Sequence, residues 1–138
     1  NEDINTDEYE AIEDIKNKIG VEVPEFYYRP QGMKFYDYTI AESTRAAYIE
    51  YQYRDTMIAF YIDKQNEYTA SNINIIKGEE NTIDTISEDG VKITIKEIRD
   101  KEEVPTCKAV WSKNEVSYSL IGKMEVEDLK KIVEYMKF

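Results

Sequence analysis

The sequence predicts an α+β fold, in which a single curved antiparallel β-sheet carries an N-terminal and a C-terminal helix on one face. Residues 33–63 and 82–98 are rich in β-formers, and apolar and polar side chains alternate there as in strands with one buried face. Asp89-Gly90, between two alternating runs, is a strong hairpin signal. Residues 126–136 instead repeat apolar side chains every three or four positions, which is typical of an amphipathic helix. We expect about six to eight strands.

The N-terminal helix is expected after a short polar tail of about residues 1–4. Asn5 and Glu8 have the spacing of a capping box, in which Asn5 caps the helix and Glu8 returns a hydrogen bond. Gly20 is expected to end the helix, because glycine tolerates the left-handed conformation that follows a helix terminus. The stripe that should face the sheet consists of Tyr9, Ile12, Ile15 and Ile19.

Two central strands are expected to meet at Arg54-Asp55, which has the position of a hairpin turn. Residues 43–47, just before them, are alternatively a helical turn. The side chains that should share one face are Ala47, Ile49, Tyr51 and Tyr53 on one strand, and Ile58, Phe60 and Ile62 on the other. Upstream, residues 25–32 carry three aromatic side chains between two prolines, in a loop or an edge strand. These rings either cap an open end of the core or form a ligand surface.

A second hairpin is expected from residues 82–86 and 91–98, with one face in water. Residues 65–80 before it are ambiguous, with a short strand at 73–76 and a loop at 77–81. The closing unit begins after a charged turn at 99–104. It consists of a strand with Trp111, a turn at Lys113-Asn114, a strand over 116–121, Gly122 and an amphipathic helix. The apolar stripe of that helix is Val126, Leu129, Ile132, Val133 and Met136.

This closing unit resembles the bacterial domain-of-unknown-function family numbered 4367. The resemblance covers residues 104–134, and upstream it extends to Val23-Pro24, Gly32 and the rhythm of the strands. The matching positions are Trp111, Tyr118, Leu120, Gly122, Leu129 and Ile132. The resemblance implies the C-terminal extracytoplasmic part of a membrane-anchored protein of a Gram-positive bacterium. It carries over no catalytic residue.

Length and composition limit the number of domains and the kinds of partner that we expect. Residues 1–138 are expected to form one domain, because this length can bury a core of its own. The net charge of −11 repels phosphate backbones and anionic headgroups, so we expect no nucleic-acid binding. The sequence has no run of about 18 apolar residues, so we expect no membrane insertion of this segment. The chain begins with Asn1 rather than Met, so we expect it to be a processed product or a piece of a longer protein.

The residue types present leave little room for catalysis. The chain has no histidine, which removes the commonest general base and metal ligand, so we predict no enzyme activity, no metal and no cofactor. Paired carboxylates are the remaining acid–base option. A hydrolase that acts on cell-wall sugars through two such carboxylates is therefore one functional hypothesis. The acidic residues within or beside strands are Asp37, Glu50, Asp63 and Asp84. The single Cys107 is expected to be a small buried side chain rather than a reactive thiol.

The large number of tyrosines is the feature that the requirements of folding do not explain by themselves. Nine of the twelve tyrosines lie between Tyr27 and Tyr68, and such amphipathic rings are enriched in interfaces. Alternatively, tyrosine covers half-buried strand faces. The residues predicted as a possible interaction surface are Tyr27, Tyr28, Tyr36, Tyr38, Tyr51 and Tyr53.

Two functions follow as expectations. The first is a non-enzymatic extracytoplasmic sensing or interaction domain, anchored at the cell surface through its parent protein, that binds a protein, a peptide or an envelope component. The alternative is a carrier of an apolar ligand held between the sheet and its helices, similar to lipoprotein-sorting proteins.

Overall fold

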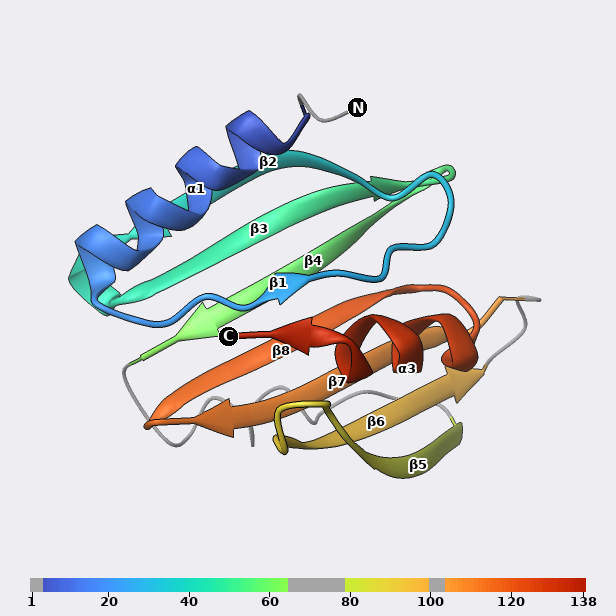
Figure 1. The fold of residues 1–138 in the computed structure, drawn as a ribbon. Coiled ribbons are helices and arrows are strands. Elements are labelled where there is room, and N and C mark those ends of the chain that lie inside the picture. Colours follow the sequence, from blue (N-terminus) through green and yellow to red (C-terminus); the bar gives the residue numbers. More distant parts are fainter. Residues whose placement is uncertain (1–3, 65–78, 100–103) are drawn as a thin grey trace.

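The computed structural model describes residues 4–64, 79–99 and 104–138 and contains one large antiparallel sheet. Its seven strands follow the order β2-β3-β4-β8-β7-β6-β5, so the second half of the chain extends the sheet that the first half begins (Figure 1). The α+β class with a single large antiparallel sheet is therefore confirmed. The bounds are β2 (Lys34–Ala41), β3 (Ala46–Tyr53), β4 (Thr56–Asp63), β5 (Glu79–Ile86), β6 (Lys92–Arg99), β7 (Thr106–Lys113) and β8 (Val116–Lys123).

A second layer covers one face of this sheet (Figure 1). Helix α1 (Ile4–Ile19) contacts β2 and β3, and helix α3 (Val126–Glu134) contacts β5, β6 and β7. Between the helices lies a small antiparallel ladder of β1 (Glu25–Phe26) and β9 (Met136–Lys137). The two helices pack on the same face, as predicted, whereas the ladder between them was not predicted.

Tight turns set the register of the hairpins. Arg54-Asp55 joins β3 to β4, as predicted, and Arg54 adopts the left-handed conformation with φ 57°. The turn between β7 and β8 is Asn114-Glu115, one residue later than predicted. Both of its residues have positive φ, at 53° and 67°, which suits the right-handed twist of the flanking strands. Lys113 instead ends β7 and pairs with Val116.

The start of the first helix differs from the prediction. Helix α1 begins at Ile4, so Asn5 lies inside it rather than capping it. Glu8 forms no capping box, because its carboxylate binds Arg29 and Tyr51. The other end agrees with the prediction, since the Gly20 N–H donates to the Lys16 carbonyl at 2.9 Å and Gly20 has φ 77°.

Three further boundaries were wrong or only partly right. Residues 79–81 form part of β5 rather than a loop, because the long β6 offers them backbone partners from Glu97 to Arg99. Met136 leaves the helical stripe, since α3 ends at Glu134 and the chain then extends to pair with β1. The helical turn expected at 43–47 is a short 3₁₀ turn over Glu42–Thr44. The strand expected at 73–76 lies outside the described residues.

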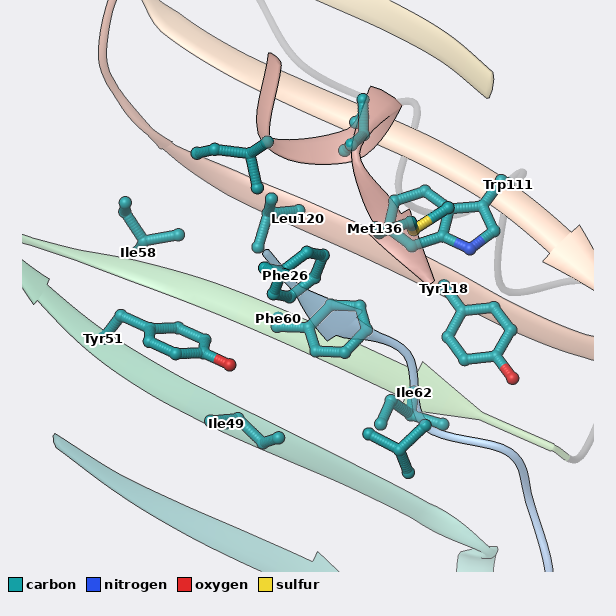
Figure 2. Close-up of a cluster of buried hydrophobic side chains, with 14 of the residues drawn as sticks. Phe26, Ile49, Tyr51, Ile58, Phe60, Ile62, Trp111, Tyr118, Leu120 and Met136 are labelled. Carbon is teal, nitrogen blue, oxygen red and sulfur yellow. The ribbon is translucent and has the colours of Figure 1, made fainter. Parts of the chain in front are cut away.

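Aromatic rings fill the centre of the space between the two layers (Figure 2). The Phe60 ring on β4 stacks on Tyr118 at 6.1 Å and on Trp111 at 5.9 Å between ring centroids. Phe26, from β1 in the other layer, meets Phe60 edge-on at 4.9 Å. Phe60 is fully buried, so its ring joins the sheet to the layer above it.

We predict that Phe60→Ala lowers the free energy of unfolding by about 3–5 kcal/mol, because it removes a buried ring and leaves a cavity. Urea denaturation followed by Trp111 fluorescence measures this loss. Tyr61→Ala is the matched control: Tyr61 is the next residue on the same strand, is 44% exposed, and should lower the free energy of unfolding by only about 0.5–1.5 kcal/mol, because it loses its ring contact with Tyr48. Equal losses in the two variants would contradict the assignment of Phe60 to the centre of the core.

Candidate functional site

A buried carboxylate stands in the apolar face of α1. Glu8 lies one helical turn before Ile12 and is only 5% exposed. Its Oε1 accepts a hydrogen bond from Arg29 Nη1 at 2.8 Å, and its Oε2 accepts bonds from Arg29 Nη2 at 2.6 Å and from the Tyr51 hydroxyl at 3.0 Å. A buried charge is tolerated when it is paired and hydrogen-bonded in this way. The three residues tie α1 to β3 and to the segment after β1.

Electrostatics keep the side chains of Arg29 and Tyr51 protonated. Burial alone would lower the pKa of Arg29, but the hydrogen bonds and the charge of Glu8 raise it above its ordinary value. Burial, together with the charge of Glu8, raises the pKa of Tyr51 well above its ordinary value, so its hydroxyl stays a donor. Arg29 also donates from Nε to the Phe26 carbonyl at 3.0 Å. The guanidinium is therefore fixed in both position and charge.

A pocket of about 420 Å³ opens beside this cluster, between α1 and residues 25–34. Two exposed rings belong to its lining, Tyr9 at 55% and Tyr27 at 65% exposure. The full lining is Glu8, Tyr9, Ile12, Glu25, Phe26, Tyr27, Arg29, Met33 and Lys34. It offers hydrogen-bonding groups, apolar surface and accessible rings in one place, as ligand pockets commonly do.

A second hollow of about 320 Å³ lies over β2, β3, β4, β7 and β8, next to a pair of rings. Tyr48 and Tyr61 face each other across β3 and β4 with centroids 5.7 Å apart. Most of its lining is apolar. Among its polar side chains, Lys108 is the most buried, with 1% exposure. The lining is Thr39, Ala41, Ala46, Ala47, Tyr48, Tyr61, Ile62, Asp63, Lys108, Ser119 and Ile121.

The structure does not bring the six predicted tyrosines together on one surface. Tyr27 and Tyr36 are exposed, while Tyr51 and Tyr53 are 1% exposed and lie in the core. Alternate residues of β3 point to opposite faces, and these two share the face that the second layer covers. Membership of Tyr51 and Tyr53 in an exposed surface is therefore wrong.

The remaining two tyrosines are partly buried and already have partners. The Tyr38 hydroxyl donates to Asp14 on α1 at 2.8 Å, and the Lys131 ammonium lies 5.7 Å from the centre of the Tyr28 ring. Tyr38 thus contacts helix α1, and Tyr28 contacts helix α3. Tyr27 is the predicted residue that lines the pocket.

Sequence reasoning missed Glu8, Tyr9 and Arg29 as site residues. Glu8 had a local explanation as a capping residue, and Tyr9 was assigned to the buried stripe, although it is 55% exposed. A usable signal was nevertheless present. Glu8 and Ile12 are separated by one helical turn, so a carboxylate in phase with the apolar stripe indicates a buried partner from elsewhere in the chain.

The carboxylates considered for catalysis are spread over the sheet. Asp37 and Glu50 are directly paired across β2 and β3, whereas Asp84 lies on β5 at the opposite edge. Asp84 there accepts a hydrogen bond from Thr94 at 3.2 Å. Among the described residues, no three acidic or cysteine side chains come together in a group that could hold a metal ion.

Cys107 is a buried side chain, as predicted. It is fully buried on β7, and its thiol donates to the Met124 carbonyl at 3.2 Å between sulfur and oxygen. Burial, followed by the charges of Glu97 and Glu125, raises the pKa of this thiol to about 12. A thiol with that pKa holds its proton at neutral pH and is a poor nucleophile.

The family model described as domain of unknown function (DUF4367) matches residues 23–136. The chain belongs to this family. Searches of curated proteins and of solved structures gave no match. In the described part of this DUF4367 domain, no helix has the length and apolar character needed to cross a membrane.

The family match begins after α1. Both Glu8 and Tyr9 therefore come from outside the matched residues, while Arg29, Tyr27 and Met33 come from inside them. The pocket of this DUF4367 domain is thus assembled from a helix that precedes the match and a segment near its beginning.

We predict that Glu8→Gln lowers the free energy of unfolding by about 3 kcal/mol, because Arg29 keeps its charge and loses the carboxylate that balances it. Chemical denaturation of both proteins measures the difference. Glu10→Gln on the exposed side of the same helix is the matched control and should cost no more than about 0.5 kcal/mol. If the two variants were equally stable, the ion pair would not hold α1 in place.

The raised pKa of Cys107 also predicts a pH dependence. The unfolded thiol titrates near pH 9 and the folded thiol near pH 12, so its contribution to stability is complete below pH 9 and is lost as the pH rises. Between pH 9 and 10, the free energy of unfolding should fall by about 1 kcal/mol more in the wild type than in Cys107→Ala. Denaturant titrations at both pH values measure this, and parallel losses would contradict it.

Proposed function

We propose that this DUF4367 domain is a non-enzymatic binding domain of a membrane-anchored protein outside the cytoplasm. It binds a protein, a peptide or an envelope component in the pocket between α1 and residues 25–34. The observation that carries the proposal is the placement of two exposed tyrosine rings, Tyr9 and Tyr27, at an opening whose lining includes the Glu8–Arg29 ion pair.

The chemistry of the lining supports binding. Exposed tyrosines supply apolar contact area with a polar tip, and they lose little conformational entropy on binding. Ile12 and Met33 add apolar surface, while Glu25 and Lys34 add hydrogen-bonding groups. A ligand can thus bury apolar area and satisfy its polar groups in the same pocket.

The ion pair supports binding by preorganising the wall of the pocket. Arg29 is fixed by three hydrogen bonds, two to Glu8 and one to the Phe26 carbonyl. A side chain that is already fixed pays little further entropy when a ligand binds to it. The same bonds engage both oxygens of Glu8, which makes this carboxylate a structural anchor rather than an acid–base catalyst in the proposal.

The location outside the cytoplasm comes from the family resemblance of the closing strand and helix. The buried, protonated Cys107 is compatible with that location, because its thiol is protected within the core.

The alternative role, a carrier of an apolar ligand between sheet and helices, receives less support. The centre of that space is filled by the stacked rings of Phe60, Trp111 and Tyr118, with Phe26 on top (Figure 2). Such a carrier should copurify with lipid that native mass spectrometry detects.

We expect the purified chain to cosediment saturably with isolated Gram-positive envelopes. The double variant Tyr9→Ala/Tyr27→Ala should bind at least about tenfold more weakly, since truncating two exposed aromatic contacts removes over 1.4 kcal/mol of binding energy. Tyr61→Ala, a change at an exposed ring of the second hollow, is the matched control and should bind as the wild type does. Unchanged binding by the double variant, or loss in the control alone, would refute this pocket as the binding site.

A further inference from the structure

We infer that the pocket takes an extended peptide, which adds as a strand along the open edge of β1 and places an uncharged backbone carbonyl on Arg29. This inference rests on the binding function proposed above and specifies its ligand.

The first support is the open strand edge. Within the described residues, β1 forms a strand ladder with β9 alone, and its Phe26 carbonyl also accepts the hydrogen bond from Arg29 Nε. Figure 1 shows β1 between β9 and α1, so its other edge faces the helix. Both residues of β1, Glu25 and Phe26, and the Tyr27 that follows them line the pocket that lies there. An unpaired edge beside a pocket is the arrangement that binds extended peptides by strand addition.

The second support is the unused hydrogen-bonding capacity of Arg29. A guanidinium carries five N–H groups, and the bonds to Phe26 and Glu8 use three of them. The other two have no partner among the described residues, although the side chain is only 24% exposed and lines the pocket. Partly buried donors of this kind favour a ligand that brings an acceptor.

The charges of the pocket indicate an uncharged acceptor. Two acidic residues, Glu8 and Glu25, and two basic residues, Arg29 and Lys34, line it, so its formal charge is balanced. A ligand carboxylate or phosphate on Arg29 would also lie close to the carboxylate of Glu8, and like charges at such a partly buried site repel each other. A peptide carbonyl accepts the same N–H groups without that repulsion.

The apolar part of the lining completes the description of the ligand. Ile12 and Met33 are buried side chains that border the pocket, and they match an apolar side chain of the peptide. The exposed rings of Tyr9 and Tyr27 are suited to contacts along its length. Sugars also stack on tyrosine, but a sugar makes no use of an open strand edge. A peptide therefore accounts for the strand edge, the donors and the rings together.

The test selects ligands for the full chain from a library of N-acetylated, C-amidated random hexapeptides and measures their affinity by fluorescence anisotropy. Successive N–H groups of a strand point to opposite sides, so N-methylation at every second residue should weaken binding at least about tenfold. Methylation at the intervening residues should have little effect. Tyr27→Ala should weaken binding about tenfold, whereas Tyr61→Ala should not.

Three results would overturn the inference: no selected peptide, an effect of methylation without this alternation, or binding of envelope glycan fragments in place of peptides. The envelope assay separates this failure from that of the binding function. If Tyr9→Ala/Tyr27→Ala still abolishes envelope binding while no peptide binds, the pocket is a binding site and only its ligand is misassigned. If the double variant binds envelopes normally, both proposals fail.

Discussion

The sheet has one apolar face that is too wide for two helices to cover. Seven strands spaced about 4.8 Å apart span roughly 29 Å, whereas each helix covers about 10 Å. The β1–β9 ladder fills the centre, where Phe26 pairs with Met136 and places its ring 4.9 Å from Phe60. One strand of this ladder comes from each half of the chain. The core is therefore closed only when both ends of the chain have reached the same face.

The pocket is a consequence of that closure. Helix α1 lies over β2 and β3, and the ladder lies beside it. Side chains must therefore pack between the helix and the ladder. At this boundary the chain places the ion pair of Glu8 and Arg29 beside the buried apolar side chains of Ile12 and Met33. Apolar residues of similar size would avoid the desolvation cost of buried charges. The presence of this charged pair beside an opening supports the proposed binding role.

Much of the sheet could be predicted because its signals are local. Arg54-Asp55 and Asp89-Gly90 mark turns, and the alternation around Tyr51 and Phe60 shows which side chains of each strand share a face. Residues 79–81 carry no such signal and become a strand through pairing with β6. For the candidate site, only Tyr27 was predicted, since Glu8 and Arg29 are separated by 21 residues and acquire a role by meeting in space.

The sequence by itself determined the α+β class, the antiparallel hairpins, the two amphipathic helices and the burial of Cys107. Periodicity and turn chemistry are properties of neighbouring residues, so they can be read without knowing where distant segments lie. Only the tertiary structure decided that Met136 leaves its helix to pair with Phe26, that Tyr51 and Tyr53 are core residues, and that Glu8 meets Arg29. Each of these outcomes depends on contacts between segments far apart in the chain, whose free energy outweighs the local preference of either segment.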